Sequence, residues 1–410
     1  MGRRAGHLMP RLVRMVTALL ASLALGPAGA SAAEVLVFRL EPREFRVRLA
    51  EIEAYASGRP VSNPLLQALS LLGERGEEQL RSLLSSPYQL DAAELRNVLA
   101  APMLQDLLGW LGSKLRPGSG GNGAAALQQA LLNAADQGEP LTVPDLIAAF
   151  PSREIHIDLD RALAALLRLL TLEQQTRQVV QAMAVSGAAI SDQNRNRDPR
   201  REGPHAVTVQ ALNLRDAARG RTLQADLYLP EHADAAPASI PVIAISHGLG
   251  STKQYYGYVA EHMASHGYAV VAVQHPGSDA SRLLGLVKGT HRSVFDVSEF
   301  IDRPLDVSHV LDHLTDLNDT TLNQALRLND VGVFGNSFGG YTALALAGAE
   351  IDTRNLRRDC DANRDSINVS LLLQCRALLL GDPDRSLREE RVGAVLTINP
   401  VNSSLFGPGG

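Results

Sequence analysis

The sequence has 410 residues, of which 45% are hydrophobic and 20% are charged, with a formal net charge of −5 at pH 7. This length predicts two or three domains, and the composition is typical of a globular chain rather than a disordered one. Four arginines and no acidic residue precede Glu34, so the rest of the chain has 35 basic and 44 acidic side chains, a net charge of −9. A mildly acidic chain argues against a nucleic-acid partner.

Residues 1–32 have the pattern of a secretory signal peptide. Basic residues precede an apolar run at 15–25, and small residues that include Ala30-Ser31-Ala32, a pattern typical of a cleavage site, follow it. The apolar run is short for a bilayer span. We therefore predict export to the periplasm or the extracellular space, while the sequence leaves open whether the signal is cleaved or retained as an anchor.

The two cysteines are Cys360 and Cys375. Export would permit a disulfide between them, and the bond would close a loop of about 15 residues, worth roughly 3 kcal/mol in the chain-entropy model. Two free, buried thiols are the alternative. Neither cysteine has a histidine nearby in the sequence, so we expect no metal site.

Residues 34–183 are expected to form a helical domain. Leucine-rich segments follow helix-start patterns, such as Asp91 with Glu94, and a long amphipathic stretch occupies 158–180. No catalytic constellation is visible in this half, and His156 is interpreted as a surface or satisfied histidine. Residues 184–204 are predicted to be a linker, in which a basic tract is compatible with a membrane surface of anionic lipid but interleaved acids favour a solvated connector.

From residue 205 to 410 the pattern changes to short strands that alternate with helices, which predicts an α/β domain with a mostly parallel sheet. Strands are expected at 206–212 and 223–229, as an antiparallel pair, and at 241–246, 268–273, 331–334 and 392–398. Helices are expected at 255–266, 304–317 and 340–347. The last strand would lie at an edge of the sheet.

The most informative motif is Gly335-Asn336-Ser337-Phe338-Gly339. It follows an apolar run and leads into an apolar helix, which is the context of a nucleophile elbow. The sharp turn would hold the Ser337 hydroxyl clear of both elements, and flanking glycines would let the strand and the helix approach closely. Ser337 is therefore the predicted nucleophile.

Attack by Ser337 on a carbonyl carbon creates an oxyanion, which needs two prearranged donors. The first is expected to be the backbone N–H of Phe338, the residue after the nucleophile. The second is expected from His247-Gly248-Leu249-Gly250, a loop at the end of an earlier strand. Its glycines suit a backbone that turns an N–H inward, and we assign the N–H of Leu249 to this role.

These segments, together with 274–278 after the next strand, resemble the α/β-hydrolase branch of platelet-activating-factor acetylhydrolases and of predicted dienelactone hydrolases. The resemblance covers roughly 205–410, and the first half is similar to a helical domain of unknown function that precedes such hydrolases. It implies an α/β-hydrolase domain preceded by an all-α domain, and a serine esterase that acts on a small-molecule or lipid ester. It implies no cofactor. True dienelactone hydrolases use a cysteine, so Ser337 favours an esterase.

Two departures from this pattern concern the acid and the base. The acetylhydrolases place their acid where this sequence has Asn399-Pro400, and His313 is the last histidine. We therefore assign no catalytic acid and no general-base histidine, and we expect a C-terminally truncated hydrolase domain that is nearly inert. A non-catalytic, hydrolase-like binding module and a serine peptidase of the same fold are the alternative functions.

Overall fold

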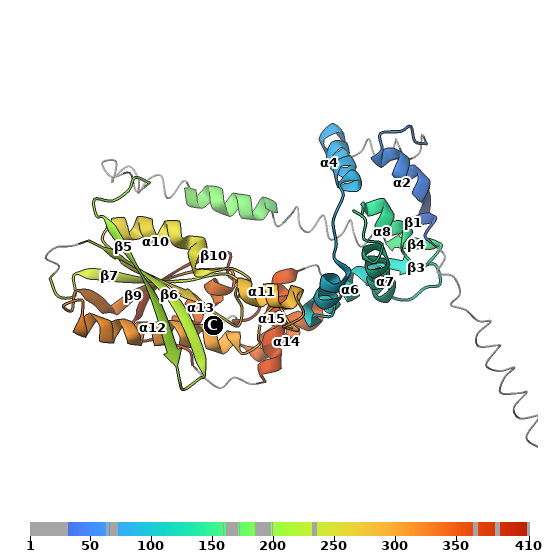
Figure 1. Cartoon of the computed structure of the whole chain (residues 1–410). Helices are drawn as coiled ribbons and strands as arrows, with labels where there is room; N and C mark the ends of the chain where they lie inside the picture. The colour runs from blue at the N-terminus through green and yellow to red at the C-terminus, as the bar shows by residue number, and fades with distance from the viewer. Residues whose placement is uncertain are drawn as a thin grey trace, which may run out of the picture. The chain divides into compact units, whose positions relative to one another are not determined.

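The computed structural model describes residues 32–62, 65, 73–158, 160, 171, 173–184, 198, 200–231, 236–363, 368–381 and 386–407 (Figure 1). The predicted signal peptide apart from Ala32, most of the predicted linker and much of the predicted helix at 158–180 lie outside these residues. The chain forms two compact units, one of 1–92 with 111–163 and one of 93–110 with 164–410. Residues 93–110, which we had placed in the N-terminal domain, therefore fold with the second unit.

The first unit contains a four-stranded sheet, with the order β2-β1-β4-β3. Strand β1 pairs antiparallel with β2 and parallel with β4. Our expectation of an all-α domain is therefore wrong. The strands are short, and the parallel pair of β1 and β4 joins segments more than 100 residues apart, which local sequence patterns do not reveal. The strands are β1 (Val35–Leu40), β2 (Arg43–Arg48), β3 (Leu115–Pro117) and β4 (Glu154–Asp158).

Helices make up much of the rest of this region, as the leucine-rich segments predicted. Helix α8 begins with a capping box, in which the Thr142 side chain accepts from the Asp145 N–H and the Asp145 carboxylate accepts from the Thr142 N–H. The helices of this unit are α2 (Leu49–Ala56), α4 (Gly73–Ser85), α7 (Ala124–Ala135) and α8 (Val143–Ala148). Most of α5 (Ala92–Leu99) and of α6 (Pro102–Lys114) belongs to the second unit.

The second unit is built on a six-stranded sheet with the order β10-β9-β7-β8-β6-β5. Strands β10, β9, β7 and β8 are parallel to one another, and β5 and β6 are antiparallel to their neighbours. This confirms the predicted mostly parallel sheet, the antiparallel pair and the edge position of the last strand. The strands are β5 (Val207–Asp216), β6 (Arg221–Pro230), β7 (Ile240–Ser246), β8 (Ala269–Gln274), β9 (Leu326–Asn336) and β10 (Val392–Ile398).

Alternating side chains of the central strands enter two different cores, because successive residues of a strand point to opposite faces of a sheet. In β7, Val242 and Ala244 pack in one core with helices α12 and α13, whereas Ile245 and the partly buried Ile243 pack in the other core with α10. Figure 1 shows α10 on one side of the sheet and α12 on the other. The sheet is thus covered on both faces, as parallel strands require.

Most helices of this unit begin or end within a few residues of the predictions. Helix α12 starts five residues earlier than predicted, because Pro304 lies inside it rather than at its first turn. The helices α11, α14 and α15 were not predicted. The elements are η2 (Lys253–Tyr256), α10 (Gly257–Ser265), α11 (Ala280–Val287), α12 (Glu299–Thr320), α13 (Phe338–Leu346), α14 (Thr353–Ala362), α15 (Val369–Cys375) and η3 (Arg376–Leu380).

The predicted disulfide is present and joins Cys360 of α14 to Cys375 of α15, with Cα atoms 6.0 Å apart. It fastens together the helices that lie between the elbow helix α13 and the last strand. Of the helices that the structure describes, none combines the length and the apolar character needed to cross a bilayer.

Candidate active site

Ser337 lies at the turn between β9 and α13, as predicted. Its backbone has φ 53° and ψ −114°, a conformation that residues other than glycine adopt rarely. The Ser337 N–H donates to the carbonyl of Ile398 at 2.9 Å, and its carbonyl accepts from the N–H groups of Gly340 at 3.0 Å and Val401 at 3.1 Å. The bonds to Ile398 and Val401 tie the strained turn to the end of the neighbouring strand β10, and such surrounding contacts are what keeps a strained backbone in place.

Close backbone packing explains the glycines of the motif. A Cβ atom on Gly335 would lie 2.0 Å from the carbonyl oxygen of Gly339, and one on Gly339 would lie 2.0 Å from the carbonyl oxygen of Ser246. A Cβ on Gly340 would lie 2.7 Å from Cβ of Pro400. The strand and the helix can therefore approach each other, and the end of β7, only where no side chain intervenes.

The loop after β7 lies against the turn. A Cβ atom on Gly248 would lie 3.4 Å from Cβ of Ser337, so this loop and the Ser337 side chain are direct neighbours. Within the described part of the chain, neither the Leu249 N–H nor the Phe338 N–H donates to another protein group. Two free amides beside a serine hydroxyl are able to bind a substrate oxygen.

His247 and His275, the histidines predicted to lie near this site, make hydrogen bonds to groups other than Ser337. The Nε2 atom of His247 accepts from the backbone N–H of His275 at 3.1 Å, so the proton of this ring lies on Nδ1, which donates to the Gly248 carbonyl at 2.7 Å. Burial, reinforced by the charge of Arg303, lowers the pKa of His247 well below its usual value. The ring is therefore a neutral bridge between two loops.

His275 is fully buried and lies between Ser246 and Asp306. Its Nε2 atom is 2.9 Å from the Ser246 hydroxyl, and its Nδ1 atom is 3.0 Å from the Asp306 carboxylate. Burial, reinforced by nearby arginines, lowers the pKa of His275 well below its usual value. This chain of bonds has the order of a catalytic triad, but no substrate can reach it because all three side chains are buried.

The end of β10 offers no carboxylate to the turn. Asn399 occupies the position expected for the acid, with φ 47°, and the side-chain amide of Asn336 donates to the Ile398 carbonyl at 3.2 Å. In the residues that the structure describes, no imidazole or carboxylate is hydrogen-bonded to the Ser337 hydroxyl. No group of three or more metal-binding side chains is found among them either.

A buried charge network, which sequence reasoning missed, supports the ends of β7 and β8. The Asp306 carboxylate accepts from Arg221 at 2.8 Å, and Arg221 also binds Glu299 at 2.8 Å. Burial raises the pKa of both carboxyl groups, and Arg221 opposes this rise. The detectable signal was the helical spacing of Glu299, Arg303 and Asp306, which places three charged side chains on one face of α12 next to its apolar residues.

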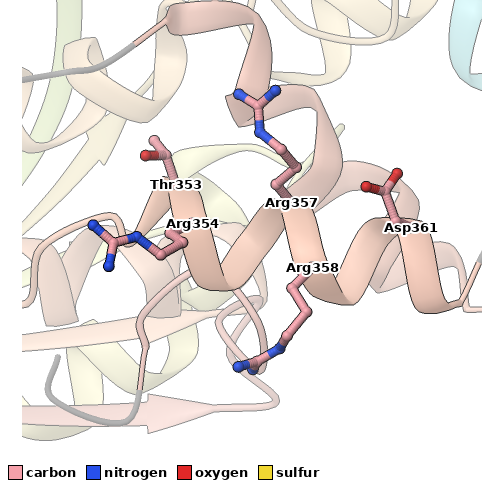
Figure 2. Close-up of a pocket in the computed structure, with 5 residues that line it drawn as sticks. All are labelled: Thr353, Arg354, Arg357, Arg358 and Asp361. Carbon is pink, nitrogen blue, oxygen red and sulfur yellow. The ribbon is translucent and has the colours of Figure 1, made fainter.

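Two hollows of the second unit have different characters. One, of about 410 Å³, lies along α14 and is lined by arginines. Figure 2 shows Arg354, Arg357 and Arg358 leaving the helix in different directions, so they do not converge on a ligand. The other, of about 240 Å³, is an apolar groove lined in part by Met103, Phe295 and Leu379.

The sheet, the strand–Ser337–helix turn and the loop beside it define an α/β-hydrolase fold. Comparison with family models agrees: residues 32–158 match a family described as α/β hydrolase of unknown function (DUF1400), and residues 238–356 match one described as serine aminopeptidase, S33. A search of curated proteins finds no significant match. These similarities indicate a hydrolase, and the second match contains Ser337, Leu249 and Phe338.

Proposed function

We propose that this protein is an exported serine hydrolase that cleaves carboxylic esters, of lipids or of short acyl groups, through an acyl-Ser337 intermediate. The observation that carries the proposal is the strained turn at Ser337 beside two amides, of Leu249 and Phe338, that have no partner among the described residues. Strained backbone is concentrated at functional sites, and a pair of unpaired N–H groups is what an oxyanion requires.

In this reaction the Ser337 oxygen attacks the ester carbonyl carbon, and the carbonyl π electrons move to its oxygen. The amides of Leu249 and Phe338 hold the resulting oxyanion. Collapse of the intermediate re-forms the carbonyl and breaks the bond to the alkoxide, which leaves with a proton as the alcohol. Water then attacks the acyl-serine in the same way and releases the acid, which restores Ser337.

The proton of Ser337 must pass to a base other than His247 or His275, because the ring nitrogens of both are hydrogen-bonded to other groups and neither ring contacts the Ser337 hydroxyl. Serine hydrolases that lack a triad member retain a rate about 10³–10⁴-fold above water, from the oxyanion hole and binding alone. We therefore expect slow, Ser337-dependent turnover of this chain, accelerated by an added base.

An apolar acyl group is favoured by the surroundings of the turn. Phe338 packs against Phe295, with ring centroids 5.5 Å apart, and Phe295 also lines the apolar groove of about 240 Å³. This groove is therefore a candidate site for a short apolar acyl chain.

A serine peptidase is the second candidate, because the match at 238–356 is to a model described as serine aminopeptidase. A non-catalytic binding module is the third, since no described imidazole contacts the Ser337 hydroxyl. The ester proposal predicts a covalent adduct on Ser337, which the binding module does not, and faster cleavage of an ester than of an amide, which the peptidase does not.

The test uses the full chain and its Ser337→Ala variant. A fluorophosphonate should form an adduct on Ser337, located by peptide mass spectrometry, and p-nitrophenyl butyrate should be hydrolysed faster than an aminoacyl p-nitroanilide. Added imidazole should accelerate ester hydrolysis by the wild type and have no effect beyond its bulk reaction with Ser337→Ala. Faster cleavage of the anilide would favour the peptidase. If no fluorophosphonate adduct forms with or without imidazole, the non-catalytic binding module is the remaining candidate.

Export is tested separately. The signal pattern predicts cleavage after Ala32, and Ala33 is buried, with its N–H 3.3 Å from the Ala148 carbonyl oxygen. Mass spectrometry of the exported fraction should find an N-terminus at Ala33. Recovery of the unprocessed chain in the cytoplasm only would contradict this part of the proposal.

A further inference from the structure

Arg303, on α12, is fully buried, and two of its three guanidinium nitrogens donate no hydrogen bond to a described group. In the described part of the chain its Nε and Nη1 atoms have no hydrogen-bond partner. Burial lowers the pKa of Arg303 to about 10, so the side chain is still charged at neutral pH. A buried cation with unused donors is costly, and such an unsatisfied group in a folded protein calls for an explanation.

The contacts of Arg303 reach both halves of the predicted oxyanion hole. Its Nη2 atom donates to the carbonyl of His247, two residues before Leu249. Its guanidinium carbon lies 4.6 Å from the centroid of the Phe338 ring, a cation–π contact between two fully buried side chains. One side chain thus joins the loop that carries the Leu249 amide to Phe338, which carries the other amide.

The other bonds at the base of the loop reinforce this connection. The His247 ring ties the loop to the backbone of His275, and the hydroxyl of the preceding Ser246 is held by the His275 ring. Further along, the Gly250 N–H donates to the Ser278 carbonyl at 2.8 Å. Arg303 differs from these anchors because it also contacts the ring of Phe338.

We infer that Arg303 is a positioning residue, which sets the separation of the Leu249 and Phe338 amides and places a fixed positive charge behind them. This rests on the proposed function, in which these amides bind the oxyanion. Both effects act on the transition state, because negative charge is present on the carbonyl oxygen only after attack. Loss of Arg303 should therefore slow the acylation step and leave ground-state binding of the ester nearly unchanged.

The first experiment does not depend on activity and uses hydrogen exchange of the full chain. Arg303→Met should increase the exchange rates of amides in 247–251 about tenfold, and Arg303→Lys should have a smaller effect because it retains a charged donor. Asn318→Ala is the control. Asn318 lies on the same helix as Arg303, about 22 Å further along α12, and the substitution removes two buried hydrogen bonds to the backbone of Leu326 in β9. Unchanged exchange in Arg303→Met, or an equal increase in Asn318→Ala, would overturn the inference.

The second experiment compares an ester with the corresponding thiono ester, whose sulfur is a weak hydrogen-bond acceptor. Arg303→Met should lower kcat for the ester about 10²-fold, with little change in KM or in the thiono ester rate, and Arg303→Lys should recover part of the loss. An equal loss on both substrates would indicate a merely structural role and refute the positioning inference. If the wild type shows no Ser337-dependent reaction, the proposed function fails, while the exchange experiment still decides the role of Arg303.

Discussion

Replacement of Gly335 by alanine is the sharpest test of how the strand, the turn and the helix fit together. A Cβ at this position would lie 2.0 Å from the carbonyl oxygen of Gly339 and 2.8 Å from the N atom of Gly340, whereas ordinary contacts begin at 3.4 Å. The obstacle is backbone, so relief requires α13 to move away from β9 by more than 1 Å. Overpacking of this kind costs about 3 kcal/mol, which corresponds to a fall in Tm of about 6–12 °C for a unit of this size.

Thermal unfolding followed by calorimetry measures this change, with Gly332→Ala as the matched control on the same strand. A Cβ at Gly332 would meet Cγ1 of Ile243 at 3.6 Å and the Val242 carbonyl oxygen at 3.8 Å, which are ordinary contacts. That substitution should be neutral or stabilising by about 0.5–1 kcal/mol, because alanine loses less backbone entropy on folding. A Gly335→Ala protein as stable as Gly332→Ala would refute the close-packing account of the motif.

Three further predictions concern bonds remote from the turn. Cys360→Ser with Cys375→Ser should lower the free energy of unfolding by about 3 kcal/mol, the chain-entropy value for a 15-residue loop, and a reducing agent should lower Tm of the wild type alone. Asp306→Ala removes a buried partner of three side chains, those of Arg219, Arg221 and His275, and should cost about 3–5 kcal/mol. Asp312→Ala, on the exposed side of the same helix, should cost less than about 0.5 kcal/mol in urea unfolding. The Arg391 guanidinium lowers the pKa of Glu389 to about 2, so this carboxylate stabilises the fold above pH 4.5 and loses its effect as pH falls towards 2. Glu389→Gln should therefore be about 1 kcal/mol less stable at pH 7, after allowance for solvent screening, and the difference should vanish by pH 2.

The sequence by itself determined the local features of the hydrolase unit. An apolar run, Gly335-Asn336-Ser337-Phe338-Gly339 and an apolar helix specify a strand, a tight turn and a helix from neighbouring residues alone, and the structure has all three. Alternation of strands with helices likewise predicted a mostly parallel sheet. The disulfide was predictable as one of two alternatives because the chain has only two cysteines.

Tertiary structure decided the features that depend on contacts between distant residues. The sheet of the first unit pairs Val35–Leu40 with Glu154–Asp158, and such short strands have no signal strong enough to be recognised separately. The same is true of Arg303, which bonds a carbonyl 56 residues earlier in the chain. A charged residue in a helix is normally expected at the surface, and only the packing of α12 against the ends of β7 and β8 shows that this one is buried beside the turn that carries Ser337.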